Sequence, residues 1–170
     1  MIDVGLQGRL FRGVKRLLGD ADVRRLMVFD QMYRLVALIT PVLLQMRTEC
    51  ERAAGPVKSC HVGHPVRFEG RDNLRNATAL GRLGEACGYA GFKHHNFYPE
   101  PIAATLSFLH SGGDGERVLA VDFGGGTLDL CVLSRRAGAK PTDFAVEAVH
   151  GIPLGGDHLD QRLFAETLFP

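Results

Sequence analysis

The sequence predicts a mixed α/β protein, because helix-like and strand-like segments alternate along its 170 residues. Apolar side chains recur at helical spacing over residues 35–54 and 73–89, whereas short β-prone runs flank a triple-glycine turn at residues 118–133. With 45% apolar and 23% charged residues, the composition is that of a globular protein able to bury a core.

The N-terminal third is expected to be mainly helical. Residues 6–18 show helical spacing, and Gly19 follows as a stop signal. Residues 26–46 form the most hydrophobic window, but its charged residues and Pro41 argue for core structure and against a membrane span. Pro41 either kinks the helix at residues 35–54 or opens a new one behind Thr40 as N-cap.

The middle of the chain is expected to alternate strand, helix, strand and helix, at residues 57–68, 73–89, 94–98 and 100–109. Cys60, His61 and His64 lie close together in the first strand. Without a second cysteine pair or an acidic partner, a free cysteine on a buried strand is favoured over a metal site. The polar run at residues 111–116, SGGDGE, is a linker.

The segment VLAVDFGGGTLD, residues 118–129, predicts a buried strand, a glycine turn and a second strand. Gly124, Gly125 and Gly126 leave backbone N–H groups able to close on an anion such as a phosphate chain. Asp122 ends the first strand where a magnesium ion or its water shell would sit, and Thr127 and Asp129 add a hydroxyl and a second carboxylate. A β-hairpin with a flexible glycine turn is the alternative.

The C-terminal part predicts a third strand at residues 144–149 and an amphipathic helix at residues 159–168. Gly155 and Gly156 precede that helix. Because helix N-termini attract anions, this glycine pair is a second candidate phosphate contact.

The charge balance argues against some classes of partner. A net charge of +1 gives no electrostatic case for nucleic acid or an anionic membrane. The four cysteines are scattered, which argues against a disulfide framework and for a reducing, cytoplasmic setting. The N-terminus does not resemble a signal peptide.

Residues 118–129 resemble the second phosphate-binding segment of the actin-like ATPase superfamily. Within that superfamily, their sequence is most similar to that of the 70-kilodalton heat-shock chaperones. VKRLLG at residues 14–19 resembles the family segment with the active-site lysine, here Lys15. The strand ending at Pro65, the Glu100-Pro101 segment and the Gly155-Gly156 pair also follow the family's order. Residues 3–5, Asp-Val-Gly, match the family's first phosphate loop at three positions only, and we interpret this match as coincidence.

The resemblance implies an incomplete actin-like ATPase (ribonuclease H-like) α/β fold: a peripheral part of the first lobe at residues 1–33, its core at 34–112 and the start of the second lobe at 113–170. It implies ATP or ADP and Mg²⁺ as cofactors, and a molecular chaperone ATPase as the activity. Possible partners are the remainder of the domain and co-chaperones. By position, the catalytic residues would be Lys15, Glu100, Asp122 and Asp129, the phosphate contacts Gly124, Gly125, Gly126, Thr127, Gly155 and Gly156, and the residues that hold Mg²⁺ through water Asp122 and Glu100.

A first phosphate loop and an adenosine pocket are missing from this pattern, so we expect weak or no ATP hydrolysis by this chain alone. The alternative is a non-enzymatic interaction module or truncated gene product that keeps the lobe surface. A sugar kinase or exopolyphosphatase shares the phosphate turn, but the contexts of Glu100 and Lys15 speak against it.

Overall fold

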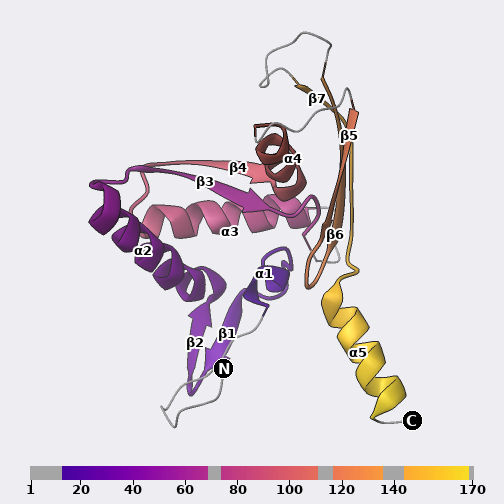
Figure 1. The fold of residues 1–170 in the computed structure, drawn as a ribbon. Helices are drawn as coiled ribbons and strands as arrows, with labels where there is room; N and C mark the ends of the chain where they lie inside the picture. The colour runs from indigo at the N-terminus through magenta and orange to yellow at the C-terminus, as the bar shows by residue number, and fades with distance from the viewer. Residues whose placement is uncertain (1–12, 69–73, 111–116, 136–143, 169–170) are drawn as a thin grey trace. The chain divides into compact units, whose positions relative to one another are not determined.

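The computed structural model describes residues 13–68, 74–110, 117–135 and 144–168, and everything below refers to these residues (Figure 1). Their elements are α1 (Val14–Leu17), β1 (Arg25–Val28), β2 (Gln31–Arg34), α2 (Leu35–Ala54), β3 (Ser59–His64), α3 (Arg75–Tyr89), β4 (His94–Pro99), α4 (Glu100–His110), β5 (Arg117–Phe123), β6 (Leu128–Arg135), β7 (Phe144–Ile152) and α5 (Gly156–Thr167). The chain forms two compact units: unit 1 is Met1–Ser59 with Glu69–His94, and unit 2 is Cys60–Phe68 with His95–Pro170.

Most of the expected elements are present within a few residues of their predicted ends. The helix predicted at residues 6–18 lies mostly outside the described part. Within that part, only the short helix α1 represents it. The linker at 111–116 and residues 3–5 also lie outside it. None of the described helices is long and apolar enough to cross a membrane.

Unit 1 contains a hairpin that the sequence analysis did not predict. β1 and β2 pair antiparallel, with Val28 opposite Gln31 across the two-residue turn Phe29–Asp30. The expectation that residues 26–46 form core was wrong for this part, because the side chains of Met27, Met32 and Tyr33 are exposed.

Helix α2 continues through Pro41 as one element, so the predicted alternative of a new helix capped by Thr40 does not occur. The Thr40 hydroxyl instead donates back to the Val36 carbonyl at 2.8 Å within the same helix. This bond lies in the turn that precedes Pro41, the residue whose backbone has no N–H to donate.

The core of unit 1 lies where α2 packs against α3. Its most buried side chains are Leu18, Leu35, Val36, Ala79, Ala86, Cys87 and Ala90. Arg82 on α3 fixes the end of α1, because its Nη1 donates to the carbonyls of Leu17, Leu18 and Asp20 at 3.2, 2.8 and 2.8 Å.

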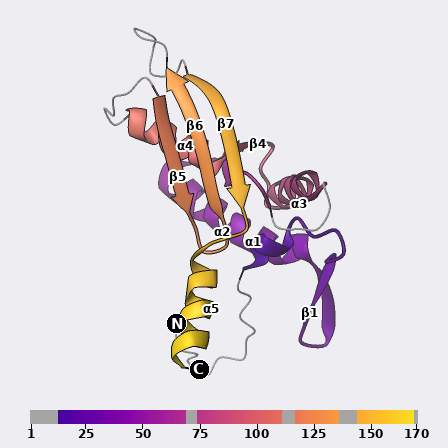
Figure 2. The same cartoon turned by 90° about the vertical axis from the view of Figure 1, so that its right-hand side faces the viewer.

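Unit 2 is built on an antiparallel sheet in the order β5-β6-β7, with α4 packed on β5 and β6. Figure 2 shows this sheet face-on, with α5 following the end of β7. β3 and β4 are hydrogen-bonded neighbours and run in the same direction (Figure 1).

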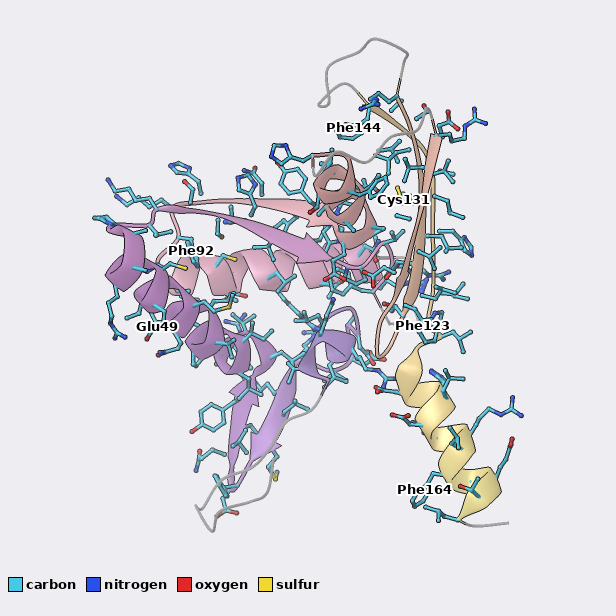
Figure 3. All side chains as sticks on the ribbon, in the orientation of Figure 1. Glu49, Phe92, Phe123, Cys131, Phe144 and Phe164 are labelled. Carbon is cyan, nitrogen blue, oxygen red and sulfur yellow. The ribbon has the colours of Figure 1, made fainter. Side chains whose placement is uncertain are left out.

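The strand predicted to be buried over residues 118–121 is half-exposed. β5 alternates, so that Val118 and Ala120 face α4 while Leu119 and Val121 are 61% and 60% exposed on the open face. On β6, Cys131 and Leu133 are fully buried on the side that α4 covers (Figure 3 labels Cys131). The core of unit 2 therefore lies on one face of its sheet.

Candidate functional site

The glycine turn joins β5 to β6 and closes on itself. β5 and β6 pair from Arg117 opposite Ser134 to Phe123 opposite Leu128, so the alternative of a β-hairpin describes the local topology. The Gly124 N–H donates to the Thr127 carbonyl at 2.9 Å and completes the turn.

The tip of this hairpin is bound to the start of α5. The Gly156 N–H donates to the Gly124 carbonyl at 2.9 Å, and the Asp157 N–H donates to the Gly125 carbonyl at 2.8 Å. Both donors belong to the first turn of α5, whose N–H groups have no partner within the helix. The turn and the Gly155-Gly156 segment are thus brought together, while their role as phosphate contacts stays a prediction.

Gly155 is required by close approach. A methyl group at this position would lie 2.6 Å from the Gly124 carbonyl oxygen and closer still to the Gly125 carbonyl oxygen. Its φ of −147° is extended backbone that any residue adopts. The absence of a side chain, and not an unusual backbone conformation, is therefore what lets the two segments touch.

Two carboxylates lie opposite each other near the turn of the hairpin. Asp122 on β5 and Asp129 on β6 are partners in the strand register, and directly paired residues project from the same face of a sheet. Asp129 is 1% exposed. Its Oδ1 accepts a hydrogen bond from the Val66 N–H at 3.0 Å, and the Thr127 hydroxyl donates a second one.

Burial raises the pKa of Asp129 above its ordinary value, and the negative charges of Glu100 and Asp122 act in the same direction. The hydrogen bonds from Thr127 and Val66 lower the pKa but do not cancel the rise. Glu100, the first residue of α4, lies against β3, where a methyl group at Gly63 would be 3.2 Å from its Cγ. Two neighbouring carboxylates of unit 2 therefore act on Asp129.

These carboxylates do not converge as direct metal ligands. Among the described residues, no three His, Cys, Asp or Glu side chains form a group that could hold a metal ion. Mg²⁺ commonly keeps several waters and uses one or two protein carboxylates. The donor set of Asp122 and Glu100 fits contact through water and does not fit an all-protein cage.

The hydrogen bonds of the turn reduce the number of backbone amides that are free to contact a phosphate. The N–H groups of Gly124, Gly156 and Asp157 already donate to backbone carbonyls. An anion at the turn would therefore rely on other groups, among them the Gly125 and Gly126 amides and the positive end of α5. Lys15 belongs to α1 in unit 1, and its role near a phosphate stays a prediction.

The sequence analysis missed two residues that shape the Asp129 site. Gly151 on β7 lies opposite Asp129, and a methyl group there would be 2.6 Å from the Asp129 Oδ1. The Val66 amide follows Pro65 in the turn after β3. Only the register of β6 with β7, which shifts between Val132 and Leu133, could have revealed Gly151.

Mixed α/β architecture, a glycine turn bound to a helix N-terminus and two paired carboxylates beside that turn, of which Asp129 is buried, fit part of an actin-like ATPase fold. A family model described as Hsp70 protein matches residues 14–168, and this chain belongs to that family.

The curated relatives carry the names of chaperone and heat-shock proteins. The chain is 32% identical over 158 residues to the protein named Chaperone protein DnaK of Thermotoga petrophila. The alignment covers 91% of this chain and 24% of the relative. It is 33% identical over 124 residues to human Heat shock 70 kDa protein 13, with 72% of this chain and 24% of the relative. The chain thus spans about a quarter of the length of these relatives.

Proposed function

We propose that this chain is an ATP-binding segment of a heat-shock-type chaperone ATPase, with weak or no hydrolysis by itself. The observation that carries the proposal is the turn at residues 124–127, which is bound to the start of α5 directly above the Asp122–Asp129 pair. Membership of the Hsp70 family supports the same ligand.

Each proposed residue has a separate part in binding. Amides of residues 125–127 and the positive end of α5 would face the phosphates, since oriented backbone N–H groups favour negative charge. Asp122 and Glu100 would hold the water shell of Mg²⁺, which when bound screens the phosphate charge. Asp129 would orient water near that shell, and Lys15 would stabilise charge developing at the γ-phosphate.

A thermal-shift titration with ATP, in magnesium and in EDTA, tests the proposal. Binding at 100 times Kd stabilises a protein by about 2.7 kcal/mol, so Mg-ATP should raise the melting temperature. We expect Asp122→Asn to remove the difference between magnesium and EDTA, while the control Asp160→Asn, an exposed carboxylate on α5, keeps it. Phosphate release should stay near the buffer background. Hydrolysis that is lost in both Lys15→Ala and Asp122→Asn would contradict the expectation of weak turnover.

A non-enzymatic interaction module is the second candidate. It is favoured by the occupied amides of Gly156 and Asp157 and by the apolar open face of the unit 2 sheet. No thermal response to Mg-ATP would support it, with co-chaperones or the rest of such a domain as partners.

We also propose a reducing, cytoplasmic setting. All four cysteines of the chain are free thiols, and burial raises the pKa of the Cys131 thiol, which keeps it protonated.

A further inference from the structure

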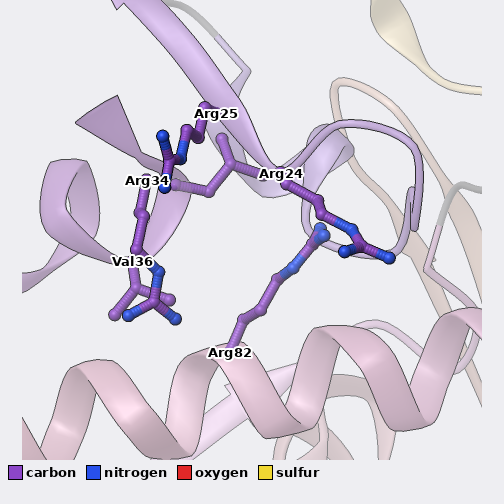
Figure 4. Close-up of a pocket in the computed structure, with 6 residues that line it drawn as sticks. Arg24, Arg25, Arg34, Val36 and Arg82 are labelled. Carbon is purple, nitrogen blue, oxygen red and sulfur yellow. The ribbon is translucent and has the colours of Figure 1, made fainter. Parts of the chain in front are cut away.

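A pocket in unit 1 is lined almost entirely by arginines. It has a volume of about 330 Å³ and lies where the β1–β2 hairpin meets the start of α2 and the side of α3 (Figure 4). Its lining consists of Arg24, Arg25, Arg34, Leu35, Val36 and Arg82. Four arginines therefore line one cavity, and among the described residues no carboxylate belongs to its lining.

The hairpin places like charges side by side. Arg25 and Arg34 are direct partners in the β1–β2 register, an arrangement that is destabilising unless something neutralises it. Arg34 has a partner outside the pocket, because its Nη2 lies 2.8 Å from the Glu85 Oε2. In the described part of the chain, Arg25 forms no ion pair.

Another wall of the pocket also brings two arginines close together. Figure 4 shows the Arg24 and Arg82 side chains directed toward each other. Arg82 is fixed by its three carbonyl acceptors, so it cannot turn away. Burial lowers the pKa of Arg82, the negative charge of Asp20 opposes this change, and the charge of Arg24 adds to it. The protein alone thus leaves excess positive charge at this site.

We infer that this pocket binds a compact phosphate-bearing molecule through the guanidinium groups of Arg24, Arg25 and Arg82. Arginine forks match phosphate oxygens in a bidentate manner, and one dianion would relieve both like-charge pairs. The volume lies at the low end for ligand pockets, so the molecule is small. The buried Leu35 and Val36 side chains supply an apolar wall for an organic part.

Calorimetric titration of the full chain with inorganic pyrophosphate, in EDTA and low salt, tests this inference. We expect binding that Arg25→Gln weakens about tenfold or more, because a hydrogen bond to a charged group contributes about 1.5–3 kcal/mol. Arg25 has no ion pair to lose and opposes another arginine, so its substitution should leave the fold intact. Arg52→Gln on α2 is the matched control, since it removes an exposed arginine of the same unit.

Two further measurements separate this site from the glycine turn and identify the source of the phosphate. Gly125→Val should leave pyrophosphate affinity unchanged. Phenyl phosphate that binds more tightly than inorganic phosphate assigns the pocket to organic phosphates, and equal affinity assigns it to free anions. No binding by the unsubstituted chain, equal affinity in Arg25→Gln, or loss in Gly125→Val with retention in Arg25→Gln would each overturn the inference.

Discussion

Asp129 is a buried acid whose environment favours the protonated form. Burial raises its pKa, whereas two hydrogen bonds to the carboxylate limit the rise. A folded-state pKa above the unfolded value means that the native state binds more protons in that window. Unfolding free energy from this group therefore falls as pH rises from the unfolded pKa to the folded one, and stays at the lower level above it.

Asp129→Asn removes this titration and keeps an oxygen acceptor for Val66 and Thr127. We expect the melting temperature of the variant minus that of the unsubstituted chain to increase with pH from about pH 3.8, the ordinary value, up to the raised pKa. Thermal melts in EDTA between pH 3 and pH 7 measure this difference. Repeating them in about 1 M salt screens Glu100 and Asp122, so the part that persists reports burial. A difference that stays constant or decreases with pH would show that Asp129 is not penalised.

Gly155 carries a second prediction at the level of one residue. In Gly155→Ala the new methyl group meets two backbone carbonyls, which cannot rotate away as a side chain would. We expect a loss of about 1–3 kcal/mol in unfolding free energy, measured by urea denaturation.

Gly156→Ala is the matched control for Gly155→Ala. Its methyl group would lie 3.8 Å from the Gly124 carbonyl oxygen, an ordinary contact, and alanine favours the helix. Equal stability of the two variants would mean that the turn does not need its close approach to α5.

At the level of elements, strongly periodic segments were predicted well. The helix at Leu35–Ala54 matches α2 at both ends, because its apolar spacing and the following Gly55 mark it clearly. The β1–β2 hairpin was missed since its turn, Phe29–Asp30, lacks glycine, and Phe29 adopts a φ of 53° that non-glycine residues rarely take. Its apolar residues merged with α2 into one hydrophobic window.

The candidate site was also predicted only in part. The motif of residues 122–129 predicted a turn with two carboxylates, and the structure brings them together with Gly155. Gly151 and Val66 were not predicted, because their relation to Asp129 depends on strand register and on a turn 63 residues away in the chain. Local patterns identify a motif, whereas tertiary pairing selects what surrounds it.

Pro41 gives a prediction for α2 as an element. The proline removes one N–H from the interior of a 20-residue helix and is itself exposed. We expect Pro41→Ala to raise the unfolding free energy by about 1–3 kcal/mol, because alanine restores the missing hydrogen bond. Urea denaturation followed by circular dichroism measures the change. Val42→Ala, which truncates an exposed neighbour, should stay within about 0.5 kcal/mol. A Pro41→Ala variant no more stable than Val42→Ala would mean that α2 tolerates the missing bond without cost.

For the molecule as a whole, the distribution of apolar surface matters most. One face of the unit 2 sheet is covered by α4, and the other exposes Leu119, Val121 and Phe123 at 61%, 60% and 49%. α5 adds exposed apolar side chains at Leu159, Leu163 and Phe164. A group of exposed apolar side chains marks an interaction site or causes association where it forms a large patch.

We therefore expect the purified chain to self-associate at micromolar concentrations and to bind a hydrophobic dye such as ANS. Val121→Lys places a charge in the middle of the exposed apolar row on β5, between Leu119 and Phe123, and it should lower both the sedimentation coefficient and dye fluorescence. The side chain points away from the core, so stability should change little. Val42→Lys, at an equally exposed valine of unit 1, is the control and should leave association unchanged. If the unsubstituted chain sediments as a monomer without dye binding, the open face does not drive association. Association lowered equally by both variants would point to net charge, because then the position of the added lysine would not matter.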